Sequence, residues 1–369
     1  PLILLGAVAG VLAAFLQGFL AVKERAWIEN VIVTGLTAGA LALCWALGWG
    51  WPGVVAAMLA GPTAGIACAA ALLSRLSPGV LRSRESGHPL PAGPLLAYSW
   101  PLLGTSMLGF LLMWSDILLM GFLRQASEVG VYGLCARLVT GVLLFHESIG
   151  QVFIPKLSDL FDAADRDGMR RLYHLSSRWA VWPALVVAWM LILWGRELLA
   201  LFGPDFARGA APLAVLAAAK AIAACAGMSG RVFAVTEQAR LNLVNLLLMV
   251  TSNIVLNLLW IPRYGALGAA AATCVSLGGI KILQVVQVGV LFRLLPWDRR
   301  SLVPIGGITA LALGMAAFRD GLGGSWGWLV PLSTFIVACL ALFLFWGVAD
   351  DERDVWRAAR GRLRSTAES

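Results

Sequence analysis

The residues able to do chemistry in this chain are a few ionisable side chains inside long apolar stretches. Asp116, Arg137, Glu147, Lys220 and Lys281 each lie well inside such a stretch. On membrane-insertion scales a central Asp, Lys or Arg costs about 2.5–3.5 kcal/mol, so each needs water, a partner or a function. These residues therefore predict a polar path through a membrane.

Asp116 and Arg137 flank one polar turn, which we expect near residues 126 and 127. Each lies about ten residues from that turn, so both would sit about 15 Å from it on adjacent antiparallel helices. They can then form a buried ion pair that pins two helices, or each can contact the substrate. The sequence leaves these two interpretations equally open.

The two lysines have no acidic residue within one helical turn of the sequence. An unpaired lysine at that depth faces a hydrated cavity more often than lipid, and snorkelling is the alternative. Glu147 follows His146 and suggests a proton relay. The alternative for Glu147 is a carboxylate that reaches interfacial water toward the cytoplasmic side.

Three cations and one aspartate in this half of the chain favour an anionic ligand. The sequence has no recognisable nucleophile arrangement, metal-ligand spacing or phosphate-binding glycine loop, so hydrolysis and ATP-driven transport are unsupported. We expect a carrier, neither an enzyme nor a metalloprotein, with no resident cofactor. Coupling to protons, an ion gradient or the membrane potential stays open.

Composition sets the class of the elements that position these residues. The chain is 60% hydrophobic and 13% charged, with a mean hydropathy of +0.83, which excludes a soluble domain of this length. Apolar runs long enough to cross a bilayer predict about eleven spans. They lie near residues 1–20, 28–48, 53–74, 95–122, 131–154, 180–195, 210–230, 241–261, 266–292, 303–318 and 326–348.

Basic residues predict the orientation of these spans. If the loop after the first span is cytoplasmic, most Lys and Arg residues fall on the cytoplasmic side, as the positive-inside rule requires. This accounts for the net charge of +8 without nucleic acid as a partner. We expect a multi-pass membrane protein with a cytoplasmic C-terminus.

Two motifs occur twice, about two hundred residues apart. Ala21-Val-Lys-Glu-Arg-Ala26 returns as Ala234-Val-Thr-Glu-Gln-Ala239, and Gly50-x-x-Gly53-x-x-Ala-Ala returns as Gly265-x-x-Gly268-x-x-Ala-Ala. The duplication predicts two homologous bundles in the same orientation, with the substrate path between them. The symmetry also predicts about three further spans ahead of Pro1, without which we expect no transport.

The domain boundaries follow from this plan. We expect the last three spans of a first bundle, a cytoplasmic linker, a second six-span bundle, two additional spans and a basic cytoplasmic tail. These segments cover residues 1–75, 76–94, 95–295, 296–349 and 350–369, respectively.

Five segments of the chain have a recognisable pattern: Asp116–Gly121, Val129–Arg137, Phe153–Ser158, Leu201–Phe206 and Asn257–Ala271. They resemble segments of bacterial polysaccharide and O-antigen flippases, a branch of the multidrug/oligosaccharidyl-lipid/polysaccharide superfamily. The resemblance covers nearly the whole chain and is strongest over residues 95–295.

The resemblance implies an all-α, two-bundle fold like that of the multidrug antiporters, in the bacterial inner membrane. It implies an undecaprenyl-diphosphate-linked oligosaccharide as substrate, with the diphosphate among Arg137, Lys220 and Lys281. Membrane lipids, a polysaccharide polymerase and chain-length proteins are the further partners that it suggests. The alternatives are a multidrug or cation antiporter, a lipid II flippase, and a non-transporting scaffold for glycan export. The two additional C-terminal spans favour a lipid-linked substrate over drugs.

Overall fold

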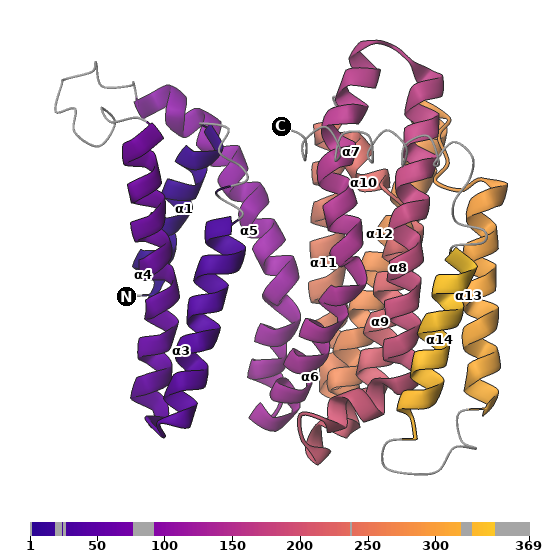
Figure 1. Ribbon diagram of the computed structural model, residues 1–369. Coiled ribbons are helices and arrows are strands. Elements are labelled where there is room, and N and C mark those ends of the chain that lie inside the picture. Colours follow the sequence, from indigo (N-terminus) through magenta and orange to yellow (C-terminus); the bar gives the residue numbers. More distant parts are fainter. Residues whose placement is uncertain are drawn as a thin grey trace, which may run out of the picture. The chain divides into compact units, whose positions relative to one another are not determined.

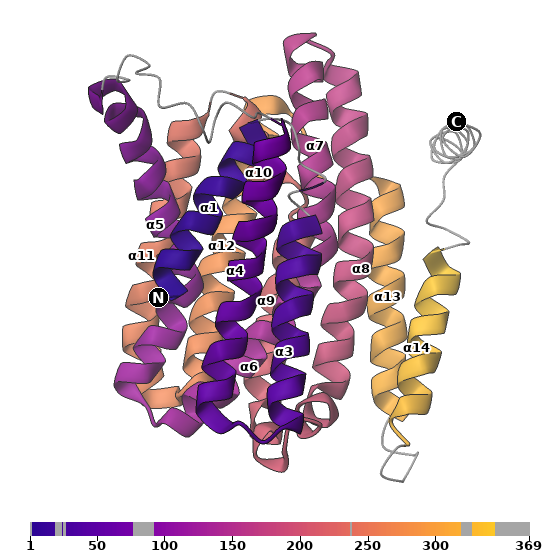
Figure 2. The same cartoon turned by 60° about the vertical axis from the view of Figure 1, so that its left-hand side comes forward.

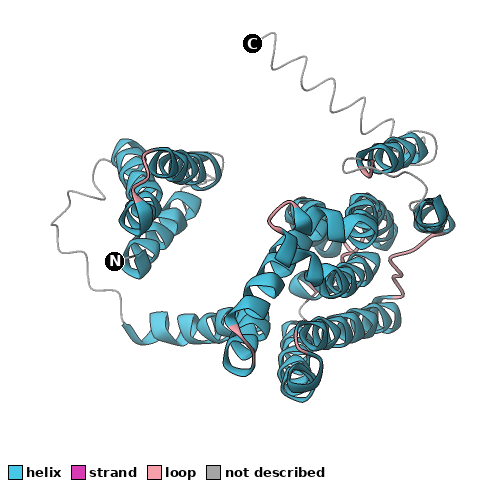
Figure 3. Cartoon of the chain, turned by 90° about the horizontal axis from the view of Figure 1, so that it is seen from below, coloured by secondary structure: helices cyan, strands magenta, loops and turns pink. Residues whose placement is uncertain are grey.

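In a computed structural model the chain forms two compact units, Pro1–Leu95 and Leu96–Ser369. The structure describes residues 2–18, 24, 27–76, 92–236, 238–318 and 327–343. Viewed along the helices, the described part consists of helices and loops without a strand (Figure 3). The first copy of the first repeated motif, most of the expected linker and all of the expected basic tail lie outside the described residues.

The first unit is a small group of apolar helices. Its elements are α1 (Leu2–Gly18), the π-helical turn η1 (Ile28–Val33), α3 (Thr34–Ala46) and α4 (Gly50–Leu76). Leu16, Ile28, Ala69 and Leu73 form its buried cluster. A Cβ atom on Gly61 of α4 would lie 2.5 Å from the backbone oxygen of Val33, so glycine is what lets these elements pack this closely.

The second unit contains the remaining helices, of which α5 begins just before the boundary (Figures 1 and 2). They are α5 (Ala92–Leu123), α6 (Ala126–Leu138), η2 (Val139–Leu143), α7 (Leu144–Asp162), α8 (Arg166–Ala200), η3 (Pro204–Gly209), α9 (Ala210–Cys225), α10 (Ser229–Val235), α11 (Ala239–Tyr264), α12 (Ala266–Phe292), α13 (Arg299–Phe318) and α14 (Leu329–Leu342). The α5–α6 turn and the α7–α8 turn lie at opposite ends of this bundle (Figure 1).

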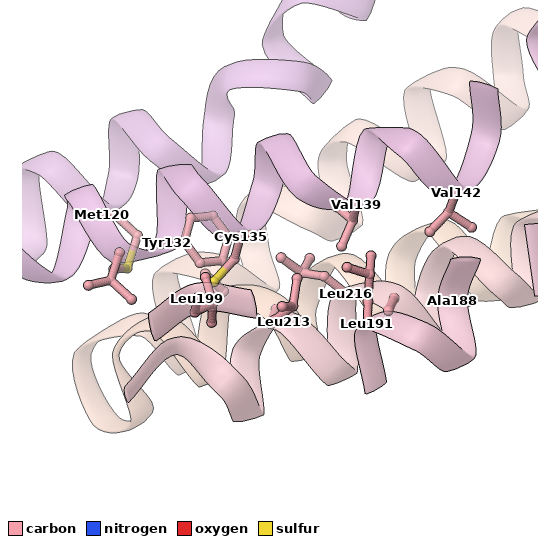
Figure 4. Close-up of a cluster of buried hydrophobic side chains, with 14 of the residues drawn as sticks. Met120, Tyr132, Cys135, Val139, Val142, Ala188, Leu191, Leu199, Leu213 and Leu216 are labelled. Atoms are coloured by element: carbon pink, nitrogen blue, oxygen red, sulfur yellow. The ribbon is translucent and has the colours of Figure 1, made fainter. Parts of the chain in front are cut away.

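The largest buried cluster of this unit joins α6, η2, α8 and α9. Tyr132, Leu191 and Leu213 are among its larger side chains, and smaller ones such as Cys135 and Ala188 lie between them and their neighbours (Figure 4). Small residues let membrane helices approach closely, which is how packing replaces the hydrophobic effect inside a bilayer. This cluster gives the polar residues described below a rigid frame.

The two C-terminal helices pack on α8. Trp182 and Trp194 of α8 share a buried cluster with Ile308 of α13 and Phe335 of α14. The rings of Trp194 and Phe335 are 5.7 Å apart. The helices of the two expected additional spans therefore belong to the same compact unit as the second bundle.

Both copies of the repeated glycine motif adopt the same local structure. Gly50 and Gly265 have φ angles of +54° and +59°, and each precedes or begins a long helix. A Cβ atom on Gly53 would lie 2.6 Å from a side-chain atom of the preceding turn, and one on Gly268 would lie 2.4 Å from a backbone oxygen of α11. The motif thus repeats a tight turn followed by close helix packing, as expected for duplicated bundles.

Arg124 joins the turn between α5 and α6 to the end of α11. Its Nε donates a hydrogen bond to the carbonyl oxygen of Ile261 at 3.1 Å, and its Nη2 donates one to that of Pro262 at 3.2 Å. The last carbonyls of a helix have no partner within the helix, so this guanidinium caps α11. Gly265 follows directly, and its backbone conformation is restricted almost entirely to glycine.

We expect Gly265→Ala to lower the free energy of unfolding by about 1–3 kcal/mol, because alanine is strained at this φ and ψ. A Cβ atom would also lie 3.0 Å from Glu128 Oε2. Thermal unfolding in detergent measures the change. Gly279→Ala in α12 is the control, since a Cβ atom there meets nothing within 4 Å. Equal stability of the two variants would contradict the strain expected at this turn.

The expected spans coincide with helices of the structure. Among the described residues, six helices are long and apolar enough to cross a membrane, and five shorter apolar helices accompany them. Each expected span overlaps one of these helices. The helical class is therefore confirmed, and the number of helices that cross the membrane stays a prediction.

Candidate functional site

A buried polar cluster lies between α5, α6, α11 and α12. We call it the Asp116 cluster. It consists of Ser115, Asp116, Tyr132, Asn253, Asn257, Thr273 and Ser276, all joined by hydrogen bonds. Polar side chains inside a membrane bundle need such partners, because lipid offers none.

Asp116 is the only ionisable carboxylate of this cluster, and its exposed fraction is 9%. It accepts hydrogen bonds from Tyr132 Oη at 2.8 Å, Asn257 Nδ2 at 2.6 Å and Thr273 Oγ1 at 2.5 Å. All three donors are neutral. The described residues thus surround a buried negative charge with dipoles and provide no ion-pair partner for it.

Asn253 holds the rest of the cluster together. Its Oδ1 accepts from Ser115 Oγ at 2.8 Å and from Asn257 Nδ2 at 3.1 Å, and its Nδ2 donates to Thr273 Oγ1 at 3.3 Å. Asn257 Oδ1 is buried and has no hydrogen-bond partner among the described residues. The cluster therefore has a spare acceptor oxygen beside a carboxylate.

Of the two interpretations left open for Asp116 and Arg137, the ion pair is not formed in the described structure, where Asp116 accepts a hydrogen bond from Tyr132 instead. The turn consists only of Arg124 and Gln125, so its centre lies earlier than we expected. The residue opposite Asp116 is then near position 132 or 133. Arg137 lies about one helical turn further on and is exposed.

A second polar site lies nearer the other end of the bundle. We call it the Lys281 cavity, a space of about 280 Å³ between α7, the α9–α10 segment, α11 and α12. Its polar lining consists of His146, Glu147, Arg231, Asn242, Lys281 and Gln284.

Two cations in this cavity have different partners. Arg231 Nη2 donates to Glu147 Oε2 at 2.6 Å, where the Arg231 side chain is 20% exposed and the Glu147 side chain 64% exposed. Lys281 Nζ donates to the neutral Gln284 Oε1 at 3.1 Å. The cavity therefore holds two positive charges and one negative charge.

Two glycines make room for these cations. A Cβ atom on Gly150 of α7 would lie 2.1 Å from Arg231 Cζ. A Cβ atom on Gly230 of α10 would lie 3.0 Å from Gln284 Oε1 and 3.3 Å from Lys281 Nζ. Any larger residue at either position would push against the charged groups or narrow the cavity.

His146 lines the same cavity and holds the break between α9 and α10. Its Nε2 donates to the carbonyl oxygen of Gly227 at 3.2 Å, while its Nδ1 is buried without a partner among the described residues. Met228 N donates to Ser177 Oγ at 3.4 Å, which fixes the break on the α8 side. The proton relay expected at Glu147 stays a prediction, and in this structure that carboxylate pairs with Arg231.

Lys220 lies in α9, half-buried, without a hydrogen bond or ion pair to any described residue. It interacts electrostatically with Asp116 and Glu147, and Lys281 interacts electrostatically with Lys220. Lys220 is thus within electrostatic reach of both polar sites. The structure brings Lys220, Lys281 and Glu147 together, with Asp116 nearby, and places Arg137 in neither site. The binding roles that we expect for these residues stay predictions.

Several residues of these sites were not evident from the sequence alone. Arg231 is one of many loop arginines in the sequence, and Tyr132 is one member of a longer motif. Asn253 and Asn257 carry a usable signal, since two asparagines at i and i+4 place a polar stripe on one face of an apolar helix.

An apolar groove of about 650 Å³ lies between α8, α9, α12 and α13. Trp189, Ile222, Ile282 and Ile305 are among its lining residues. Trp297, which also lines the groove, donates a hydrogen bond from Nε1 to the carbonyl oxygen of Cys225 at 2.6 Å. Such a groove suits a hydrocarbon chain and offers almost no polar contact.

The chain resembles one solved transporter structure across most of its length. The lipid II flippase MurJ, in an inward closed conformation, superposes with a TM-score of 0.67 at 14% identity, over 91% of this chain and 71% of that one. At this identity the likeness shows the fold alone. It confirms the predicted fold class.

Two curated relatives come from Haloferax volcanii. The probable flippase AglR is 26% identical over 60% of this chain and 46% of its own length. The probable low-salt glycan biosynthesis flippase Agl15 is 23% identical over 50% of this chain and 39% of its own length. The matched regions thus span less than half of each relative.

The polysaccharide biosynthesis protein family matches residues 1–161. This region covers the first unit and continues through α5, α6 and most of α7. It includes Asp116 and Tyr132 of the Asp116 cluster and Glu147 of the Lys281 cavity. With the two relatives, this match bears out the family resemblance expected from the motifs: over residues 1–161 the chain is similar to polysaccharide biosynthesis proteins.

Proposed function

We propose that this protein is a flippase that moves an undecaprenyl-diphosphate-linked oligosaccharide from the cytoplasmic to the outer leaflet of a bacterial inner membrane. The observation that carries the proposal is the internal cationic site formed by Lys281, Arg231 and the nearby Lys220 within an apolar bundle. A diphosphate cannot enter hydrocarbon unaided, and such a site replaces part of its hydration.

The proposed mechanism is alternating access without covalent chemistry. Lys281 and Lys220 attract the diphosphate as point charges, whereas Arg231 can bind it through a planar fork. The protein acts as a carrier and not as an enzyme. We place the C-terminus in the cytoplasm on the basis of the charge distribution.

The apolar groove gives the hydrocarbon tail a place outside the polar sites. Trp189 and Ile282 offer an apolar surface to a tail, and α13 forms one wall. Keeping the tail in an apolar groove avoids bringing it into the hydrated path. We therefore propose that the head group and the hydrocarbon tail of the substrate bind at separate places, and that α13 helps to hold the tail.

The Asp116 cluster is the part of the described structure that best suits a coupling ion. The Asp116 carboxylate has no ion-pair partner among the described residues, so its oxygens can receive a proton or a small cation. The spare Asn257 Oδ1 is a further oxygen ligand of the kind that hard cations prefer. We propose that uptake and release of this proton or cation accompany the transport cycle, and Lys220 senses the change electrostatically.

Three other functions would give different experimental outcomes. A multidrug antiporter that exports cationic drugs would not place Lys220 and Lys281 at its site, because like charges repel such a substrate. A scaffold would not need an internal charged cavity. A lipid II flippase shares the diphosphate chemistry and differs in the sugar.

The decisive experiment uses the product of the complete reading frame in proteoliposomes. We expect a lipid-linked oligosaccharide placed in one leaflet to become accessible to a membrane-impermeant sugar-modifying enzyme on the other side, at a rate at least tenfold above protein-free vesicles. The control is an equal amount of protein with a cationic dye. Dye export without lipid movement would indicate an antiporter, movement of lipid II alone would change the substrate, and no movement of any of them would indicate a scaffold.

A further inference from the structure

We propose that the Lys281 cavity is a phosphate-binding site in which Glu147 acts as a built-in counter-ion that the incoming phosphate displaces from Arg231. The inference rests on the proposed flippase function and identifies which groups receive the charged part of the substrate. The family resemblance suggests Lys281 as part of a diphosphate site, but it indicates neither Arg231 nor an exchange with Glu147.

The ion pair between Arg231 and Glu147 is asymmetric. The Arg231 side chain is only 20% exposed, whereas that of Glu147 is 64% exposed. In a water-filled cavity an exposed carboxylate leaves its partner at little cost, because water can solvate it. The half-buried guanidinium is less well solvated and favours another anion in its place. When this ion pair breaks, we therefore expect the Glu147 carboxylate to move away and the Arg231 guanidinium to stay in the cavity.

The remaining donors of the cavity are unused or only partly used. Lys281 Nζ has three hydrogens and donates to one neutral acceptor, Gln284 Oε1. Asn242 adds an amide donor to the lining. A fork, a point charge and an amide donor together suit a phosphate group.

The size of the cavity limits what it holds. Its volume of about 280 Å³ is at the lower end of ligand pockets, which measure about 300–1,000 Å³. A phosphate or diphosphate fits this space, and an oligosaccharide must extend beyond it. Gly230 borders the space, and a Cβ atom there would lie 3.0 Å from Gln284 Oε1. The cavity thus selects a charged head and leaves the sugars outside.

The phosphate has two potential sources, the diphosphate of a polyprenyl-linked sugar and a free phosphate compound. Both present the same oxygens to Arg231 and Lys281. The experiment therefore measures binding of inorganic pyrophosphate to full-length protein in detergent by calorimetry. Competition by polyprenyl diphosphate in mixed micelles then identifies a lipid source, and binding of pyrophosphate without such competition identifies a free one.

The variants have opposite expected effects. Lys281→Gln should weaken pyrophosphate binding at least tenfold, because a buried charge contact is lost. Glu147→Gln should strengthen binding by at least threefold, because it frees Arg231 without removing a donor. Gly230→Ala should weaken binding by narrowing the cavity, whereas Gly279→Ala, which has open space around it, should not.

Weaker binding by Glu147→Gln would overturn the exchange, since the carboxylate would then support the site rather than compete for it. Absence of pyrophosphate binding to the wild-type protein would overturn the site itself. If Gly230→Ala does not fold, Lys281→Gln and Glu147→Gln still decide the question. Vesicle transport is a separate readout, so loss of this inference leaves the proposed flippase function testable.

Discussion

Replacing Asp116 by alanine is expected to lower the free energy of unfolding by about 2–4 kcal/mol. The change leaves Tyr132 and Thr273 without their acceptor, and Asn257 keeps only its bond to Asn253; each buried unsatisfied donor costs about 1–3 kcal/mol. Loss of a buried charge returns part of that cost. Thermal unfolding of the purified protein in detergent measures the difference.

Arg137→Ala is the matched control, because Arg137 is exposed and does not pair with Asp116. Its effect should stay within about 0.5 kcal/mol. The doubly substituted protein, Asp116→Arg with Arg137→Asp, should be no more stable than Asp116→Arg alone. If the double variant regained stability, that result would support an ion pair between the two positions, which the described structure lacks.

Asp116 also tests the proposal that its cluster binds a coupling ion. A cation present at a concentration of ten times its Kd stabilises the native protein by about 1.4 kcal/mol. The wild-type protein should therefore unfold at a higher temperature in a salt of the coupling ion than in choline chloride of equal ionic strength. Asp116→Asn should remove this effect. A wild-type protein that is equally stable in alkali cations and in choline would contradict cation binding at the Asp116 cluster.

The apolar framework was predictable from the sequence, because a hydrophobic run of this length is stable as a helix in lipid and costly to expose to water. The similarity of the two glycine motifs was also predictable from the sequence, since Gly50 and Gly265 both adopt a positive φ that favours glycine. The motifs around Asp116 lie within residues 1–161, the region that matches the polysaccharide biosynthesis protein family. These features are local, so residue type and spacing alone reveal them.

The contacts between helices were not predictable in the same way. A shift of the turn by less than one helical turn replaced Arg137 with Tyr132 opposite Asp116. Glu147 forms an ion pair with Arg231, which lies 84 residues further along the chain, and no local spacing in the sequence indicates that pair. Buried polar partners depend on the rotation of each helix, which a hydrophobicity pattern with little amphipathic character does not determine.

Lys220 carries the other large expected effect. Its Nζ has no hydrogen bond or ion pair among the described residues, and it interacts electrostatically with Asp116 and Glu147. A half-buried lysine without a direct partner is costly in a membrane helix, so its removal should not destabilise the fold. We expect Lys220→Ala to yield normal amounts of folded protein and to slow lipid-linked oligosaccharide translocation at least tenfold.

The substitutions at Lys220 separate charge from shape. Lys220→Arg should retain part of the translocation rate, because it keeps the positive charge while changing a point charge into a fork. Lys220→Gln should be as slow as Lys220→Ala. A cysteine at this position, with the native cysteines replaced, should react with a membrane-impermeant thiol reagent and be protected by substrate. Normal translocation by Lys220→Ala together with an unreactive cysteine would mean that Lys220 faces lipid or protein, and the cationic path would then have to be built from Lys281 and Arg231 alone.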